Sequence, residues 1–598
     1  MQWGRALDAA IAAARIAGDR LRRDFHRPGG PRGHADKAEA DVEAELEIRG
    51  RLLAAFPEWG YLGEETGRVG GEPGQPVWLV DPNDGTRDYL KGRRGSAVSI
   101  GLAHEGRAVL GVVFAFGYPD DSGDLFAWAE GCGPLRRNGR AVERLLAASL
   151  AADDVVLVSS AADRDPEANL RCSAPARYRA LPSVAHRLAL AAAGEGGGVV
   201  SLFAPSAWDY AGGQALLRAA GGVLVNESGE DVAYSGDGSS STLRAFGGSR
   251  GVARLLSERD WQTLGDGGSG APSKLTRLRR GQAVADAGLL SRAQGCLLGQ
   301  IAGDSLGGLV EFDRAEQVAA RYTDGPRLLE DGGHWDILAG QPTDDSEMAL
   351  TLARSIVEAD GYRAETALRD YRLWYRSAPF DIGATTRAAL VGYLMAESQA
   401  NGSLMRASPL GILGHAWDPA RVADLAAQDS ALTHPNPICV ASVQAFTVAV
   451  SHAIGHGDGP RRAYDAALAW ARRADVPAAV VRALEAADGE PPVCDSGNVG
   501  WVLLALQNAF HALLRSASLE EGVVATVRRG GDTDTNAAIA GALLGAVHGR
   551  DAIPEQWRVM VLSCRPHSLK GRRPRPVAFW PVDALELAER LLISGRGS

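Results

Sequence analysis

The sequence is poor in the residues that mark secreted or membrane proteins. It has only six cysteines in 598 residues and no Cys-x-x-Cys pair, so a disulfide framework is not expected. The first 25 residues carry charges throughout and lack the apolar core of a signal peptide. No uncharged apolar run long enough to cross a membrane is expected. We therefore predict a cytoplasmic protein with reduced thiols and no membrane partner.

Basic residues are also in the minority. The chain has 63 Lys and Arg against 73 Asp and Glu, which gives a net charge of −10 and argues against sequence-specific nucleic-acid binding. An acidic protein can still bind phosphates where metal ions or local arginines neutralise them. The composition is therefore compatible with an enzyme that acts on small phosphorylated molecules.

The length exceeds what one hydrophobic core usually supports, so at least two domains are expected. Helical and strand-like segments alternate up to about residue 260, whereas later residues form Ala/Leu-rich helical segments with short Gly/Pro breaks. Between them, GDGGSGAPS at 265–273 has the composition of a flexible linker. We predict a domain at 1–262, a linker at 263–282 and a second domain at 283–598.

The stretch WLVDPNDGTRDY at 78–89 combines a buried strand end with acidic residues. The residues after Val80 predict a sharp turn that carries Asp81 and Asp84. Two carboxylates so close repel each other unless a cation lies between them, and Mg²⁺ suits carboxylate, carbonyl and hydroxyl ligands. An ordinary surface turn explains this stretch, taken alone, equally well.

Two further motifs accompany this stretch, GEET at 63–66 and WDYAGG at 208–213. In this order the three resemble the motifs of the inositol monophosphatase family, which are Mg²⁺-dependent, lithium-sensitive phosphatases, over about residues 1–260. The resemblance implies a layered α/β sandwich domain. It implies metal ligation by Glu64, Asp81, the Asn83 carbonyl, Asp84 and Asp209, catalysis by Glu64 and Thr86 backed by Asp41, and substrate contacts at Gly85 and Thr86. Ala38 and Asn83 depart from the family pattern, which has threonine and isoleucine or leucine there.

The second half has its own acidic segments, GDSLGGLVEF at 303–312, GQPTDDSEMAL at 340–350 and GGDTDTN at 530–536. A helix cap followed by acids favoured by the helix dipole accounts for Thr343, Asp344 and Asp345 taken alone. It accounts less well for Asp532 and Asp534, because two acids crowded before an apolar helix need a counter-charge.

With DIG at 381–383, NGSLMR at 401–406 and LTHP at 432–435, residues 291–595 resemble the ADP-ribosylglycohydrolase family. The resemblance implies an all-α domain with two divalent metal ions, Mg²⁺ or Mn²⁺. It implies metal ligation by Glu311, Thr343, Asp344, Asp345, Asp532, Asp534 and Thr535, a substrate contact at Asp381 and a catalytic part for Asp344. Whether Glu311, Asp344 or Asp345 transfers protons stays open.

We therefore expect a bifunctional hydrolase. The phosphatase substrates left open are an inositol phosphate, a nucleotide bisphosphate, a sugar bisphosphate and a 2′-phosphate of the NADP type. The ADP-ribosyl acceptor could be a protein, a nucleic acid or a small molecule, and a homodimer is one option for the assembly. The alternative is that one half is a non-catalytic sensor of ADP-ribose or of a phosphorylated metabolite. A decayed site usually lacks an acid, and neither implied metal set does.

Overall fold

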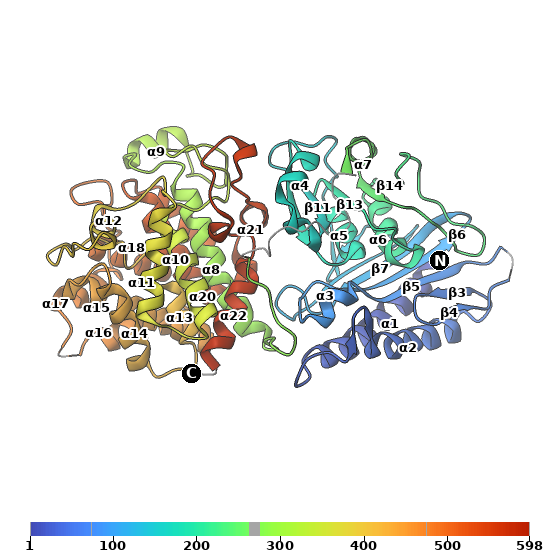
Figure 1. Ribbon diagram of the computed structural model, residues 1–598, viewed down its shortest axis with the longest axis horizontal. Coiled ribbons are helices and arrows are strands. Elements are labelled where there is room, and N and C mark those ends of the chain that lie inside the picture. Colours follow the sequence, from blue (N-terminus) through green and yellow to red (C-terminus); the bar gives the residue numbers. More distant parts are fainter. Residues whose placement is uncertain (1, 73, 262–274, 474, 597–598) are drawn as a thin grey trace. The chain divides into compact units, whose positions relative to one another are not determined.

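The computed structural model describes residues 2–72, 74–261, 275–473 and 475–596, and the chain divides into two compact units (Figure 1). One unit comprises Met1–Ser273 and Leu278–Ala285, and the other comprises Lys274–Arg277 and Asp286–Ser598. Residues 263–274 of the predicted linker lie outside the described residues. Beyond them, Leu275 and Leu278 are buried, and Arg94 donates to the Val284 carbonyl at 2.7 Å. Residues 278–285 are thus fastened to the N-terminal unit.

The N-terminal unit contains two large sheets. The eight-stranded sheet has the order β10-β9-β8-β7-β6-β5-β3-β4, and the five-stranded sheet has the order β12-β11-β13-β15-β14. The first comprises β3 (Gly60–Gly63), β4 (Gly67–Val69), β5 (Val77–Asp84), β6 (Ala97–His104), β7 (Arg107–Ala115), β8 (Asp124–Ala129), β9 (Arg136–Arg137) and β10 (Arg140–Ala141). The second comprises β11 (Val155–Ser159), β12 (Arg177–Leu181), β13 (Gly198–Ser201), β14 (Val223–Val225) and β15 (Ala245–Gly248). A two-stranded ribbon pairs β1 (Gly33–His34) with β2 (Lys37–Ala38).

Helices cover these sheets in layers. The helices are α1 (Gln2–Phe25), α2 (Glu39–Ala55), α3 (Thr86–Leu90), α4 (Pro166–Ser173), α5 (Val184–Ala192), α6 (Ala207–Ala219) and α7 (Arg250–Ser257). Side chains of β6 alternate between the two faces, as a strand requires. Val98 and Ile100 join the core formed with α1 and α2, whereas Ser99 and Gly101 face α6. Helices α5 and α6 also contact strands of the smaller sheet. The unit is therefore a layered α/β sandwich.

The sharp turn predicted directly after Val80 is wrong. Strand β5 continues to Asp84 and stays paired with β6, Asp81 opposite Ser99 and Asp84 opposite Ala97, with a register shift between the two pairs. Pro82 lies in this irregular part, where its missing N–H breaks no regular ladder bond. The chain turns only at Gly85, whose φ of 102° favours glycine.

The second unit is helical, and its described residues contain no β-strand. Its α-helices are α8 (Ala287–Gly307), α9 (Ala315–Arg321), α10 (Asp344–Ala359), α11 (Ala364–Arg376), α12 (Ala384–Leu390), α13 (Ser408–Leu413), α14 (Pro419–Ala431), α15 (Pro437–His456), α16 (Pro460–Ala471), α17 (Ala478–Ala486), α18 (Val502–Arg515), α19 (Leu519–Val527), α20 (Thr533–His548), α21 (Glu555–Ser563) and α22 (Ala584–Arg596). Helix α12 ends at Leu390, and Val391, Tyr393 and Leu394 are exposed beyond it.

Helices α8 and α20 pack against each other through glycine. A Cβ atom at Gly541 would overlap the carbonyl oxygen of Gly299, and one at Gly545 would overlap that of Gly295. At the next turns of α8, Gly303 and Gly307 meet the backbone of Ala537 and Thr533. Without side chains in between, the two backbones lie in direct contact. This approach brings the acidic end of α8 to the start of α20.

The expectation that no segment has the length and hydropathy of a membrane span is wrong for one helix. Helix α15 has 20 residues with a mean hydropathy of 1.6 in its most apolar window. Of that window, 72% is buried inside the structure, where α15 contacts α13, α14, α16 and α20. A buried core helix has this composition, because all of its faces touch other helices.

Candidate functional sites

Four predicted acids of the N-terminal unit come from three different elements. Asp81 and Asp84 lie on β5, Glu64 directly follows the parallel neighbour β3, and Asp209 lies in the first turn of α6. Burial raises the pKa of Glu64 to about 7 and the pKa of Asp81 and Asp209 well above the ordinary value, and mutual repulsion adds to each shift. In the described part of this unit, no three carboxylates bring oxygens within 4.8 Å of one another.

Asp84 is held at the start of α5. Its Oδ2 accepts hydrogen bonds from the Ser183 hydroxyl at 2.5 Å and from the Ala185 amide at 2.7 Å. Behind it lies the fully buried guanidinium of Arg187, which donates to the carbonyls of Ser183, at 3.1 Å, and of Val200. Burial lowers the pKa of Arg187 to about 10, and the negative charge of Asp84 opposes that shift. Arg187 thus links α5 and β13 beside the acids.

Thr86, Asp41 and Asn83 form a second group beside these acids. The Thr86 hydroxyl lies 2.9 Å from both Asp41 Oδ2 and the Asn83 carbonyl oxygen, and the Asn83 amide donates to Asp41 Oδ1 at 2.9 Å. The contact between Thr86 and Asp41 is the one that the family resemblance implies. Burial raises the pKa of Asp41 to about 8, against the effect of these two hydrogen bonds.

Glu45 is a buried acid of this site that the sequence reasoning missed. Its carboxylate accepts hydrogen bonds from the Glu65 amide at 2.7 Å, from the Thr66 amide at 2.9 Å and from the Thr66 hydroxyl. A Cβ at Gly63 would overlap this carboxylate, so the glycine of GEET makes room for it. Glu45 lies one helical turn after Asp41 on α2, and two acids at that spacing on a face that packs inward were the available signal.

The two glycines of WDYAGG place Asp209. A Cβ at Gly212 would lie 2.9 Å from Ser99 Oγ on β6, and one at Gly213 would lie 2.5 Å from Leu188 Cβ on α5. Helix α6 therefore fits closely between β6 and α5. Asp209 caps the start of α6 by accepting a hydrogen bond from the Ser206 amide at 2.8 Å. The motif thus fixes Asp209 in the first turn of a helix that close packing against β6 and α5 holds in place.

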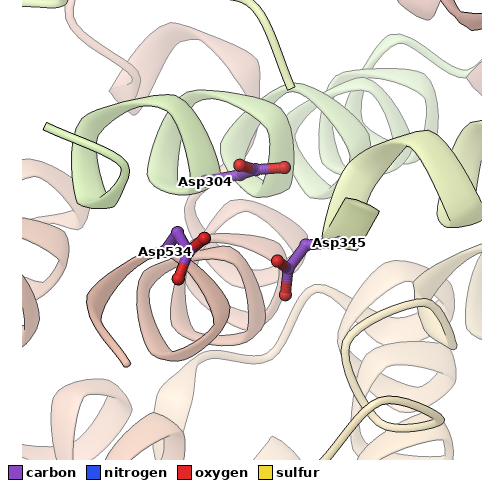
Figure 2. Close-up of side chains that lie close together, drawn as sticks. All are labelled: Asp304, Asp345 and Asp534. Carbon is purple, nitrogen blue, oxygen red and sulfur yellow. The ribbon is translucent and has the colours of Figure 1, made fainter. Parts of the chain in front are cut away.

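In the helical unit, buried carboxylates form two groups that share one residue. Asp304, Asp345 and Asp534 make the first group and Glu311, Asp532 and Asp534 the second, with ligand oxygens within 4.8 Å of one another in each. Figure 2 shows the first three turned toward one another from α8, α10 and α20. Burial, reinforced by the neighbouring carboxylates, raises the pKa of Asp345 and Asp534 well above the ordinary value.

Asp304 was not among the predicted site residues. It is fully buried on α8, and its carboxylate accepts hydrogen bonds from the Thr343 hydroxyl at 2.9 Å, the Thr343 amide at 3.1 Å and the Ser346 amide at 3.0 Å. It therefore holds the TDDSE turn at the start of α10. Burial raises its pKa to about 6. Its place in a Gly-Asp-Ser segment, one turn after the glycines of α8, was the signal in the sequence.

Further contacts hold the acids of this site in place. Glu311 accepts a hydrogen bond from the Trp335 indole at 2.5 Å, and burial raises its pKa to about 8. Asn401 donates to Asp532 at 2.7 Å. Asp344 and Asp381 lie beside each other, and burial together with their mutual charge raises the pKa of Asp344 well above the ordinary value. The Thr343 hydroxyl also lies 3.0 Å from Asp345, and Thr535 bonds to Asp345 as well.

Both donor sets suit a divalent cation. They consist of carboxylates, hydroxyls and carbonyls, which are the ligands that Mg²⁺ and Mn²⁺ prefer. The described residues leave buried oxygens without a hydrogen-bond partner in each site, Asn83 Oδ1 in one and Asp345 Oδ1 in the other. Buried like charges of this density need positive charge to remain ionised at neutral pH.

Comparisons with known proteins agree with this division. The sequence profile of the inositol monophosphatase family matches residues 4–254, and that of the ADP-ribosylglycohydrolase family matches residues 285–594. The inositol-1-monophosphatase of Mesorhizobium japonicum is 32% identical over 246 residues, which cover 38% of this chain and 89% of the relative.

Two relatives match the helical unit. The ADP-ribosyl-(dinitrogen reductase) glycohydrolase of Rhodospirillum rubrum is 31% identical over 278 residues, covering 44% of this chain and 88% of the relative. An ADP-ribosylarginine hydrolase of Serratia proteamaculans is 28% identical over 286 residues, covering 45% and 74%. The chain therefore belongs to two hydrolase families, the inositol monophosphatase family over its N-terminal part and the ADP-ribosylglycohydrolase family over its C-terminal part.

Proposed function

We propose that the N-terminal unit hydrolyses a phosphate monoester and that the helical unit hydrolyses an ADP-ribosyl glycosidic bond, each with divalent metal ions. The observation that carries the proposal is the pair of acidic clusters, each built from elements distant in the sequence, in which neighbouring carboxylates raise one another's pKa. Purely structural acids would be expected to pair with arginine, as Glu347 does with Arg575 at 2.7 Å.

In the N-terminal site, Glu64, Asp81, Asp84, Asp209 and the Asn83 carbonyl would hold Mg²⁺. When bound, the ions supply charge neutralisation of the phosphate and a nucleophilic water at neutral pH. Asp41 accepts a hydrogen bond from the Thr86 hydroxyl, so the Thr86 oxygen is free to accept a hydrogen bond from the attacking water. Glu64 would accept the second proton of that water. Gly85, next to Thr86, would let a substrate phosphate approach the backbone.

In the helical site, Asp304, Thr343, Asp344, Asp345, Glu311, Asp532, Asp534 and Thr535 would hold two ions. The ions supply Lewis acidity toward the ribose hydroxyls and toward a water molecule. Asp381 and Asp344, which lie beside each other, would stabilise the positive charge that develops at the anomeric carbon. Trp335 orients Glu311 through the 2.5 Å hydrogen bond, which leaves the other Glu311 oxygen for the site.

The acceptor that we propose for the helical site is an ADP-ribosylated arginine on a protein. The proposal draws on the relatives described as acting on ADP-ribosylarginine and on ADP-ribosylated dinitrogen reductase. For the N-terminal site, the relatives support a small phosphate ester as substrate. Since no predicted acid is absent from either site, a purely sensing role for one half has less support than catalysis.

Activity assays on the intact chain test both parts of the proposal. Phosphate release from a panel of phosphate monoesters and ADP-ribose release from an ADP-ribosylarginine peptide should both require Mg²⁺ or Mn²⁺ and should both stop in EDTA. Turnover that persists at full rate in EDTA would refute the metal assignment. A chain with bound metal but no turnover of any tested substrate would favour the sensor alternative.

A further inference from the structure

Two large apolar side chains are displayed beside the candidate phosphatase site. Phe203 is 56% exposed and Leu243 is 67% exposed, although most aromatic and aliphatic side chains of this unit are buried. Phe203 lies in the short segment between β13 and α6, six residues before Asp209 in the first turn of α6. Exposed apolar side chains beside a candidate active site are typical of a ligand-binding surface.

Backbone contacts join the two residues to each other and to the acid. The Ala204 amide donates to the Leu243 carbonyl at 3.0 Å, and Ser206 pairs with Ser241 in an isolated antiparallel bridge. The Ser206 amide in turn donates to Asp209 at 2.8 Å. The segments 203–206 and 241–243 therefore run side by side and reach the start of α6, where the predicted metal ligand Asp209 lies.

The Leu243 segment is ordered by a dedicated anchor. One carboxylate oxygen of Glu227 accepts hydrogen bonds from the Thr242 hydroxyl at 2.9 Å, the Leu243 amide at 3.1 Å and the Arg244 amide at 3.2 Å. Three hydrogen bonds to one charged oxygen hold a loop firmly. Leu243 is thus exposed on a fixed backbone, which is how a binding residue is presented and not how a disordered loop tip behaves.

The position of these residues also relates them to the predicted ligand Asp84. Strands β11, β12 and β13 are parallel, so their carboxyl ends meet at one edge of the smaller sheet. Ser183, after β12, contacts Asp84, and the 203–206 segment follows β13. Asp84 and the segment that carries Phe203 therefore meet at that edge of the smaller sheet.

We infer that Phe203 and Leu243 form the leaving-group subsite of the phosphatase and that its substrate is a phosphate monoester of a nucleoside. This inference rests on the proposed phosphatase function. A nucleobase has an apolar π-face that stacks on an aromatic ring, whereas a cyclic polyol has hydroxyls around its ring that an apolar surface would leave unpaired. The reaction transfers the phosphoryl group to water, which yields the nucleoside hydroxyl and inorganic phosphate.

Steady-state kinetics of the intact chain in Mg²⁺ test the inference. The substrates are adenosine 3′-monophosphate, myo-inositol 1-phosphate and glycerol 2-phosphate, and the variants are Phe203→Ala, Leu243→Ala and Phe203→Trp. Loss of a stacking contact should raise KM for the adenosine ester roughly 5- to 100-fold with kcat unchanged. Phe203→Trp should keep a low KM. Values for glycerol 2-phosphate should not change, because that leaving group is too small to use the subsite. Leu145→Ala, which removes the side chain of a 92% exposed leucine elsewhere in this unit, is the matched control and should change nothing.

A preference for myo-inositol 1-phosphate over the adenosine ester, or unchanged KM in both alanine variants, would overturn the subsite while leaving a phosphatase. Failure of the wild-type chain to release phosphate from all three esters would overturn the proposed function itself.

Discussion

Replacing Asp534 by asparagine should separate metal binding from folding in the helical unit. Asp534 is the residue shared by the two carboxylate groups, so both proposed metal ions lose a ligand at once. Asparagine keeps the shape and keeps an oxygen for the hydrogen bond that Asp534 Oδ1 accepts from the Thr535 amide at 2.8 Å. The change therefore removes charge with little change in packing.

The expected size of the metal-dependent stabilisation follows from the linkage between metal binding and folding. An ion at a concentration 100-fold above its Kd stabilises the folded state by about 2.7 kcal/mol, so two ions contribute about 5 kcal/mol. For a domain of roughly 310 residues, that corresponds to a rise in Tm of about 8 °C. In EDTA the effect of the substitution on the stability of the helical unit should reverse. Without metal, burial and the neighbouring Glu311 and Asp345 raise the pKa of Asp534, so keeping this acid in the folded state costs stability at neutral pH, and the neutral Asp534→Asn should be as stable as the wild type or more stable.

Differential scanning calorimetry of the intact chain, with saturating Mn²⁺ and with EDTA, measures both effects. Wild type should show a metal-dependent rise in the Tm of the helical unit that Asp534→Asn lacks. Asp424→Asn, at an exposed position on α14, is the control and should behave as wild type. If the asparagine variant retained the full rise, or if it were less stable than wild type in EDTA, Asp534 would be a structural residue and not a metal ligand.

Three further perturbations test other parts of the molecule. Glu45→Gln should lower phosphate release roughly 10- to 100-fold, because the GEET turn loses its anchor, and should leave ADP-ribose release unchanged; equal loss of both activities would contradict this. In EDTA, the free energy of unfolding by urea should fall as pH rises from about 6.5 to 8.5, because Glu64 and Glu311, with folded pKa values of about 7 and 8, hold protons that the unfolded chain has already lost. A rise across that window would be the wrong sign. Gly541→Ala should destabilise the helical unit by about 1–3 kcal/mol in urea unfolding, whereas Gly50→Ala, at a helix position with no atom within 4 Å of its Cβ, should not destabilise the other unit.

The pH window is chosen because other buried groups act in the opposite direction below it. Burial lowers the pKa of His186 and His434 to about 3, so the unfolded chain takes up protons there that the folded chain does not. Their effect is to reduce stability as pH falls below about 6.5. Above that pH the histidines are neutral in both states, and the carboxylates with raised pKa values determine the slope.

Much of the fold could be predicted from local patterns. The β6–β7 hairpin, α1, α2 and most long helices of the second unit follow from their periodicity. The path of β5 through Pro82 could not, because pairing with β6 overrides the turn propensity of five successive residues. The end of α12 at Leu390 could, because Gly392 two residues later takes a φ of 98°, which favours glycine and ends the helix.

The sequence motifs indicate the acids of each site but not the residues that hold the motifs in place. Asp81, Asp84 and Asp209 lie together, because the end of β5 lies beside the first turn of α6. Glu45 and Asp304 were missed for one shared reason. Each lies inside a helix and binds the backbone of a motif that is distant in sequence, so only the packing of that helix reveals its role. The glycines that permit those approaches were visible in the sequence, but the partners they admit were not.

The central claim is that one chain contains two independent metal-dependent hydrolase sites, and one paired measurement tests it most directly. Phosphate release and ADP-ribose release should be measured on the same preparations of wild type, Asp84→Asn and Asp534→Asn, with Mg²⁺ and Mn²⁺ present. Asp84→Asn should lose phosphate release and keep ADP-ribose release, and Asp534→Asn should do the reverse. Wild-type rates for both reactions in either variant, or loss of both reactions in each, would contradict the assignment of the two sites.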